Sequence, residues 1–292
     1  MPMYMPSRMA RIKQRIARLM PPSVVSSHSV RRETKALSRT PRLECDTRKL
    51  RLRSEIDLSE LFDSHEIQTR WDQSSKKTEQ LAIPERRGGL NVGDRRALYY
   101  LISSLNPSSV LEIGTHIGAS TLHIASAMFM NRLRDGTPPQ LISVDIADVN
   151  SPASKPWLVH GSSRSPRAMA EEMGYTKFVE FITDDSLSYF AECRQRFDVI
   201  FLDGDHAAAT LYQEIPGALS VLNPNGVILL HDYFPQLTRL WPDVPMIPGP
   251  FLATERLERE GAKLVVLPLG SLPWRTKVQS NATSLALLLR RQ

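Results

Sequence analysis

Cysteine is scarce in this chain: only Cys45 and Cys193 occur among 292 residues. Two thiols cannot form a disulfide framework, and such usage is typical of a reducing compartment, so we expect a cytoplasmic location. Long apolar runs are also missing: none approaches the roughly 18–20 residues that span a bilayer, which argues against an integral membrane protein. No acidic residue precedes Glu33, a feature that would equally suit an organellar transit peptide.

Charge is distributed unevenly along the chain. Residues 1–53 contain 14 Lys and Arg against 3 acidic residues, a net charge of +11, whereas the remaining 239 residues have a net charge of −5. We therefore divide the chain into a basic extension, 1–53, and a body, 54–292. The acidic body argues against a nucleic-acid substrate, because phosphates are bound by a basic face.

Apolar residues in the extension recur at spacings of four and three, which predicts a short amphipathic helix. They are Met5, Met9, Ile12, Ile16 and Leu19. Pro21-Pro22 would end this helix, and the Ser/Thr-rich sequence that follows to Thr47 is predicted to be a linker. Four roles for the helix stay open: contact with a membrane surface, contact with a partner protein, targeting, or no role beyond a disordered basic tail.

Short apolar runs bounded by turn residues predict seven strands in the body. They are Val110–Ile113, Leu141–Val144, Phe178–Ile182, Val199–Leu202, Val227–Leu230, Leu264–Leu267 and Leu285–Leu289. Helical stretches such as 121–133 and 208–222 separate the earlier runs, which is typical of a doubly wound, mostly parallel α/β sheet covered on both faces. Because no helix separates the last two runs, we expect an antiparallel edge strand there.

A glycine turn follows the first predicted strand, with Gly114-Thr115-His116-Ile117-Gly118 leading to Ser120. Glycine allows a tight turn and a close approach of a ligand to the backbone. The spacing differs from the Gly-x-Gly-x-x-Gly pattern that places a pyrophosphate on a helix. Glu112, just before the turn, would repel a pyrophosphate but could hold an ammonium group. Asp145, at the end of the second strand, can accept hydrogen bonds from both hydroxyls of a ribose.

These features resemble class I S-adenosylmethionine-dependent methyltransferases, whose fold is Rossmann-like. Over residues 89–232 the resemblance narrows to catechol-type small-molecule O-methyltransferases. In that family the segment matching Val92 contacts the cofactor, the serine matching Ser120 lies near its carboxylate, and the serine matching Ser186 contacts its ring. The resemblance implies S-adenosylmethionine as cofactor, bound by Val92, Glu112, Gly114, Thr115, His116, Gly118, Ser120, Asp145, Ser186 and Asp203.

Carboxylates and imidazoles follow the fourth and fifth predicted strands. Asp203, Asp205 and His206 come after the fourth strand, and His231 and Asp232 come after the fifth. The two strand ends are neighbours in the predicted sheet, so three carboxylates could converge on an oxygen-seeking cation. Mg²⁺ is the best candidate, because it binds a few carboxylates together with waters and a substrate oxygen.

The family resemblance supports a metal site only in part. In catechol-type enzymes the aspartates matching Asp203 and Asp232 bind Mg²⁺, but the third ligand, an asparagine, is replaced here by Tyr233. Asp205 could supply the missing ligand, since the Asp-Gly-x-His form looks more like the sugar O-methyltransferases of the macrocin and mycinamicin type. His206 matches the general base of both types, and we group Asp203 with it as catalytic.

The sequence therefore predicts methyl transfer from S-adenosylmethionine to a hydroxyl of a small molecule, namely a phenol, a catechol or a sugar. Mg²⁺ would assist and His206 would be the general base. Two alternatives stay open: a non-catalytic cofactor-binding scaffold docked through the N-terminal helix, and an N-methyltransferase or RNA methyltransferase. The proline-rich segment 234–251 is expected to form a loop over the site, and the oligomeric state, a homo-oligomer included, is open.

Overall fold

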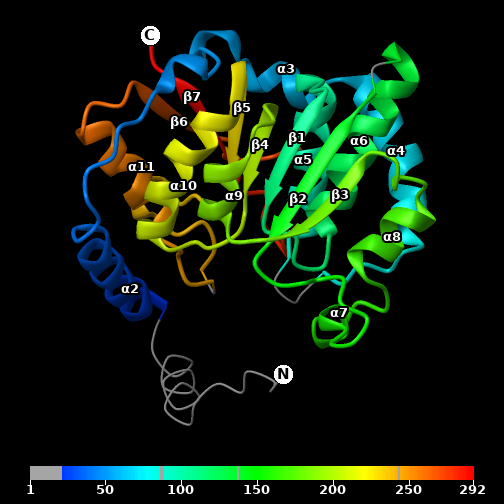
Figure 1. Ribbon diagram of the computed structural model, residues 1–292, viewed down its shortest axis with the longest axis horizontal. Coiled ribbons are helices and arrows are strands. Elements are labelled where there is room, and N and C mark those ends of the chain that lie inside the picture. Colours follow the sequence, from blue (N-terminus) through cyan, green and yellow to red (C-terminus); the bar gives the residue numbers. More distant parts are fainter. Residues whose placement is uncertain (1–21, 86–88, 137, 243) are drawn as a thin grey trace.

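The computed structural model describes residues 22–85, 89–136, 138–242 and 244–292, so the helix predicted over residues 5–19 lies outside it. The described chain folds around one seven-stranded sheet with the order β3-β2-β1-β4-β5-β7-β6 (Figure 1). The strands are β1 (Ser109–Ile113), β2 (Gln140–Asp145), β3 (Val179–Thr183), β4 (Phe197–Leu202), β5 (Leu222–Leu230), β6 (Leu264–Pro268) and β7 (Ala286–Arg290).

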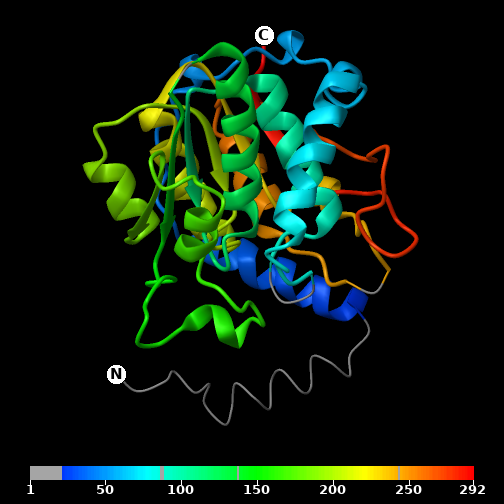
Figure 2. The same ribbon diagram turned by 90° about the vertical axis from the view of Figure 1, so that its right-hand side faces the viewer.

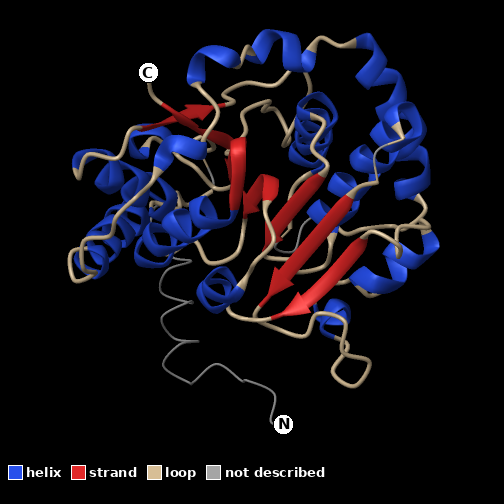
Figure 3. Ribbon diagram, turned by 45° about the horizontal axis from the view of Figure 1, so that its top comes forward, coloured by secondary structure: helices blue, strands red, loops and turns tan. Residues whose placement is uncertain are grey.

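Helices cover both faces of the sheet (Figures 2 and 3). One layer comprises α3 (Leu58–Phe62), α4 (His65–Glu79), α5 (Val92–Leu105), α6 (Ala119–Asp135) and α8 (Pro166–Glu172). The other comprises α2 (Pro22–Leu37), α9 (Ser186–Glu192), α10 (Ala208–Val221) and α11 (Gly249–Arg259). Short helical turns complete the chain: η1 (Thr47–Lys49), η2 (Arg53–Glu55), α7 (Pro156–Val159) and η3 (Pro235–Leu237).

The side chains of strand β4 are buried on both faces of the sheet, which explains why this sequence forms a central strand. Val199 and Phe201 are buried in the cluster on the α5/α6 side, and Ile200 and Leu202 are buried in the cluster on the α10 side. Successive side chains of a strand point to opposite faces. A continuous apolar run therefore requires cover on both faces, as the sequence predicted. The parallel pairing of β1 with β2 and β4 confirms the predicted doubly wound sheet.

The predicted antiparallel strand is confirmed, and its position is now defined. Strand β7 pairs antiparallel with both β5 and β6 and lies between them. Strand β6 is therefore the edge of the sheet. Because β6 runs in the same direction as β5, the 269–285 connection to β7 lies at the carboxyl ends of the parallel strands. This connection brings residues 276–280 to the candidate site.

The linker predicted between Pro22 and Thr47 is wrong for its first half, because residues 22–37 form helix α2. In Figure 1 this helix lies against α10 and α11. Low apolar content suggested disorder, but a few contacts hold the helix: Leu37 is buried in the core cluster, and the Glu33 side chain is buried as well. Farther along, Arg51 donates its N–H to the Gly226 carbonyl at 2.9 Å. The extension thus packs on the body from Ser26 onward.

No helix in the described ranges has the length and apolar character needed to cross a membrane.

Candidate active site

A cavity of about 1600 Å³ opens at the carboxyl ends of the parallel strands. Loops after β1, β2, β3, β4 and β5 line it, together with residues 240–247 and 276–280. Ligand pockets usually measure about 300–1,000 Å³. The cavity is therefore large enough for a nucleoside-sized cofactor and a small second substrate, and it lies where doubly wound sheets bind ligands.

The glycine turn after β1 is held by backbone geometry and by Asp145. Gly114 has a φ of +99°, and a Cβ atom there would lie 2.4 Å from the carbonyl oxygen of Asp203. Only glycine can fill such a position. Asp145 Oδ2 accepts hydrogen bonds from the backbone N–H groups of Thr115 (3.1 Å) and His116 (2.9 Å). Asp145, which the sequence predicts to bind a ribose, therefore holds the glycine turn in place.

Glu112 lies behind the glycine turn rather than on the cavity wall. It is fully buried, and its Oε2 accepts hydrogen bonds from Thr121 Oγ1 and, at 2.6 Å, from Ser143 Oγ. Its Oε1 is buried with no hydrogen-bond partner among the described residues. Burial raises the pKa of Glu112 from 4.5 to about 7, although the hydroxyl hydrogen bonds oppose this shift.

This shift predicts a pH dependence of stability. The unfolded chain releases the Glu112 proton near pH 4.5, while the folded chain retains it to about pH 7, so the free energy of unfolding should fall as the pH rises between these values. Glu112→Gln has no proton to release, so its free energy of unfolding should fall by about 3 kcal/mol less than that of the wild type over this pH range. Urea unfolding at several pH values measures the difference. Glu180→Gln, at an exposed position of β3, is the matched control. An identical pH dependence in both variants would contradict the shift.

Eight of the ten cofactor residues predicted from the sequence line the cavity, and Glu112 and Gly118 do not. The eight are Val92, Gly114, Thr115, His116, Ser120, Asp145, Ser186 and Asp203. Gly118 has a φ of +76°, and a Cβ atom there would lie 2.9 Å from Pro166. We conclude that Gly118 closes the turn against the start of α8.

Two residues that the sequence reasoning missed belong to the same end of the cavity. Ile146 is 77% exposed although it is apolar, and it lines the cavity next to Asp145. Glu214, on α10, is buried and accepts a hydrogen bond from Ser186 Oγ at 2.6 Å. Burial raises the pKa of Glu214 to about 7. An acidic residue directly after an apolar strand can be recognised in the sequence as a candidate site residue. Glu214 lies in the middle of a helix, where the sequence gives no such indication.

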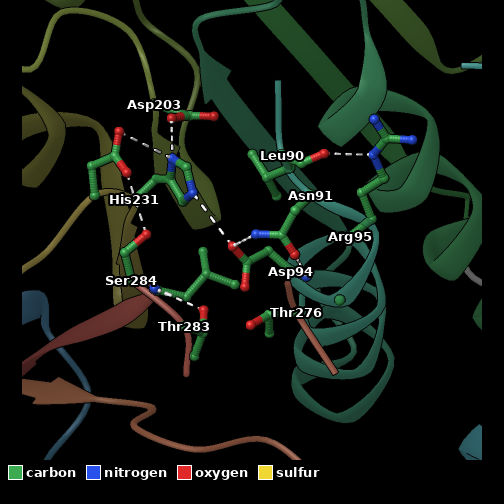
Figure 4. Close-up of polar contacts among 12 residues, drawn as sticks. Leu90, Asn91, Asp94, Arg95, Asp203, His231, Thr276, Thr283 and Ser284 are labelled. Carbon is green, nitrogen blue, oxygen red and sulfur yellow. Dashed lines mark hydrogen bonds and ion pairs between the residues drawn. The ribbon is translucent and has the colours of Figure 1, made fainter. Parts of the chain in front are cut away.

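An acid–imidazole cluster forms where β4 and β5 end (Figure 4). His231 Nδ1 donates to Asp203 Oδ1 at 2.7 Å and lies 3.7 Å from Asp232 Oδ2. Burial alone lowers the pKa of His231, but the neighbouring carboxylates outweigh it and raise this pKa well above its ordinary value. These two carboxylates therefore favour the protonated form of the imidazole.

A third carboxylate, Asp94, completes this cluster from the first turn of α5. Its Oδ2 lies 3.8 Å from His231 Nε2 and accepts a hydrogen bond from Asn91 Nδ2, as Figure 4 shows. Asp94 is fully buried, and its Oδ1 has no hydrogen-bond partner within the described ranges. The sequence reasoning singled out Val92, two residues earlier, but not Asp94. Asn91 caps α5, so the pattern reads first as an ordinary helix start.

His206 is the most accessible member of the cluster. Its side chain is 31% exposed and lines the cavity, with Nε2 3.4 Å from Asp232 Oδ2 and 3.9 Å from Asp203 Oδ1. The structure thus brings together four of the five residues that the sequence grouped: Asp203, His206, His231 and Asp232. A half-exposed imidazole backed by carboxylates can exchange a proton with a molecule in the cavity.

The arrangement does not fit the predicted Mg²⁺ site of Asp203, Asp205 and Asp232. No three His, Cys, Asp or Glu side chains of the described residues are grouped so that they could hold a metal ion. The Asp205 carboxylate is used locally, because it accepts hydrogen bonds from Ala207 N (3.1 Å) and Thr210 Oγ1 (2.7 Å). The His231 ring, in turn, occupies the space beside Asp203 and Asp232.

The other end of the cavity has a mainly apolar wall. Trp241 lines it, with the Lys277 ammonium 3.4 Å from the ring centroid. Burial lowers the pKa of Lys277 from its ordinary value. Trp241 belongs to the expected 234–251 loop, whereas Lys277 comes from the β6–β7 connection and carries no sequence signal. Tyr233 is buried in the core, and Trp274 is partly buried against it.

Comparison with known proteins agrees with this geometry. Residues 111–233 match a sequence family described as a methyltransferase domain. No curated protein sequence matches the chain. The O-methyltransferase of Bacillus cereus, solved with S-adenosylhomocysteine, superposes with a TM-score of 0.50 and 16% identity over 76% of this chain and 91% of that chain.

A second similar structure is the O-methyltransferase TomG of Streptomyces achromogenes, which is involved in tomaymycin synthesis and was solved with S-adenosylmethionine. It superposes with a TM-score of 0.50 and 15% identity over 76% of this chain and 90% of that chain. At identities this low, the superpositions establish the fold alone. The chain therefore has the Rossmann-like fold of these S-adenosylmethionine-dependent methyltransferases, as the sequence predicted, and residues 111–233 match a methyltransferase domain family.

Proposed function

We propose that this protein transfers a methyl group from S-adenosylmethionine to a hydroxyl of a small molecule. The observation that carries the proposal is that one cavity joins two sets of residues. Gly114 and Asp145 lie at one end, and His206 lies beside the carboxylate of Asp232. A cofactor held by the first set and an acceptor hydroxyl beside the second would lie within the same enclosed space.

The residues at the cofactor end fit S-adenosylmethionine. The exposed apolar side chain of Ile146 offers a surface for a ring. Asp145 Oδ1 accepts one backbone hydrogen bond, from Ala147 N at 2.9 Å, and a carboxylate oxygen can accept a second, from a ribose hydroxyl. Ser186 and Glu214 add polar atoms beyond the ring position. When bound, the cofactor would supply an electrophilic methyl group on its sulfonium.

We assign His206 as the general base that removes the proton from the acceptor hydroxyl. An acceptor hydroxyl becomes a better nucleophile as its proton moves to a nearby base. Nε2 of His206 is available for this step, and Asp232 Oδ2, 3.4 Å away, stabilises the charge that forms on the ring. Because His231 Nδ1 is engaged with Asp203 at 2.7 Å, we assign His231 to holding that carboxylate in place. We derive no step through a divalent cation, because the carboxylates do not fit one.

The acceptor end favours a small molecule. Trp241 and Lys277 line it, with Leu240, Val244 and Ile247 from the same loop as Trp241. Such a surface packs against a phenol, a catechol or the apolar face of a sugar. A phosphate backbone would meet instead the acidic cluster of Asp203, Asp232 and Asp94, which argues against an RNA substrate.

The test is a transfer assay on the full chain with methyl-labelled S-adenosylmethionine. The acceptors are matched phenols, catechols and glycosides, each with its O-methylated analogue as control, and each assayed with Mg²⁺ and with a chelator. We expect label in at least one free hydroxyl acceptor, and turnover that survives the chelator. Cofactor binding without transfer to any acceptor would favour the scaffold alternative, and label in an amine or in RNA would overturn the O-methyltransferase assignment. Turnover only with Mg²⁺ would show that Asp205 joins Asp203 and Asp232.

A further inference from the structure

Helix α10, which begins just after His206, lacks a cap from its own N-cap residue. That residue is Ala207, whose side chain cannot accept a hydrogen bond. The first N–H groups of a helix have no partner within the helix and need an acceptor. Here a carboxylate from a distant part of the chain supplies one: Glu33 Oε2, on helix α2, accepts a hydrogen bond from Ala208 N at 2.9 Å.

The Glu33 carboxylate is itself well fixed. The residue is 7% exposed, and its Oε1 accepts a hydrogen bond from Arg32 Nη2 at 2.9 Å. A negative charge is stabilised at a helix N-terminus by the helix dipole. Both carboxylate oxygens are therefore engaged, one on its own helix and one on α10.

The His206 backbone lies against a second fixed element. Gly249, at the start of α11, is so close that a Cβ atom there would lie 1.8 Å from the His206 carbonyl oxygen. Glu33 thus holds the chain two residues after His206, while α11 blocks the carbonyl side. Without the Glu33 contact, Ala208 N loses its acceptor, and the first turn of α10 keeps the bonds to Asp205 from Ala207 N and Thr210 Oγ1. We therefore expect a small displacement of this turn and of His206.

Helix α2 also contacts the wall of the acceptor end. Ser26 Oγ accepts a hydrogen bond from Met246 N at 3.4 Å. Val30, one turn farther along the helix, packs with Phe234, Trp241 and Met246. The same helix therefore reaches both the residue assigned to proton transfer and the tryptophan assigned to the acceptor.

We propose that Glu33 is a positioning residue that holds His206 in place through the first turn of α10. On this basis helix α2, although it belongs to the basic extension, helps to position the residues that we assign to the acceptor. The proposal rests on the proposed function, because it assigns Glu33 to the proton transfer by His206.

The test compares Glu33→Ala with Glu33→Gln in the full chain. Alanine removes the acceptor, so we expect kcat to fall about tenfold, because small displacements of a catalytic group are costly. The Kd for S-adenosylmethionine should stay within about twofold, since the cofactor end is untouched. Glutamine retains an oxygen that can accept the Ala208 N–H, so Glu33→Gln should restore most of the lost turnover.

Asp46→Ala is the matched control. Asp46 caps η1 within the same extension, and its carboxylate accepts hydrogen bonds from Arg48, so its loss should weaken the extension without displacing His206. Wild-type turnover in Glu33→Ala, or an equal loss of kcat in Asp46→Ala, would overturn the proposal.

Hydrogen exchange of the Ala208 amide provides a readout that needs no substrate. It should be clearly faster in Glu33→Ala than in the wild type, and unchanged in Asp46→Ala. This measurement separates the two proposals. If the wild type transfers no methyl group, the proposed function fails, but hydrogen exchange of the Ala208 amide still shows whether Glu33 holds this turn. Unchanged exchange in Glu33→Ala would refute the positioning role even if the wild type is an active methyltransferase.

Discussion

Replacing His206 with alanine is expected to lower kcat about 10²–10⁴-fold, the usual contribution of a positioned general base. The imidazole lines the cavity with its Nε2 3.4 Å from Asp232 Oδ2. The other imidazole of the cluster, His231, is engaged with Asp203 through Nδ1, so we do not expect it to replace His206. The affinity for S-adenosylmethionine should stay within about twofold, because the cofactor end of the cavity lies on the glycine turn and Asp145.

Single-turnover methyl transfer and cofactor calorimetry together check this prediction. His206→Gln should be nearly as slow as His206→Ala, because an amide keeps polar contacts but cannot act as a base. His65→Ala is the control: this exposed histidine starts α4, away from the cavity. Full turnover in His206→Ala would assign the imidazole a structural role. A parallel loss of cofactor affinity would indicate that the variant has disturbed the whole site.

The sheet could be predicted from the sequence because each strand is a local pattern. The run at 199–202 is apolar at every position, and its alternate residues enter the two core clusters. The strand ends then bring Asp203 and Asp232 together, since β4 and β5 are parallel neighbours. Residue type and strand position were sufficient for this part of the site.

The metal site could not be predicted reliably, because the sequence does not show how each strand-end side chain is used. Asp205 is close in the chain to Asp203, but it has local partners in Ala207 N and Thr210 Oγ1. His231 precedes Asp232 directly, yet its ring turns inward between the carboxylates. Such choices depend on which partners are within reach after folding.

The contribution of the extension was hidden for a different reason. Glu33 and Ala208 are 175 residues apart, and no local pattern links them. The segment around Glu33 is poor in apolar residues, which suggested a linker, because a chain that buries little apolar surface stays disordered. Helix α2 is held instead by a few specific contacts, such as the hydrogen bond of 2.8 Å from Arg256 Nη2 to the Thr40 carbonyl just beyond it.

Replacing Asp145 with alanine is expected to weaken S-adenosylmethionine binding about 10²-fold. Loss of a charged acceptor by one ribose hydroxyl, at about 1.5 kcal/mol, accounts for about tenfold. We expect a further factor of about ten from the glycine turn, because the N–H groups of Thr115 and His116 lose the same carboxylate. Asp145→Asn, which keeps one acceptor oxygen, should lose about tenfold. Asp148→Ala is the control, because Asp148 lies in the same loop and accepts only a local backbone hydrogen bond, from Asn150 N at 3.1 Å.

Calorimetry with two ligands separates ribose recognition from support of the turn. Asp145 also accepts the N–H groups of Thr115 and His116, so a loss of affinity alone could reflect a disturbed turn. We therefore compare S-adenosylhomocysteine with its 2′-deoxy analogue. The wild type should bind the deoxy analogue about tenfold more weakly, and Asp145→Ala should bind both alike, because the missing hydroxyl has then lost its partner. If the variant discriminates between the two ligands as strongly as the wild type, Asp145 supports the turn and another residue binds the ribose.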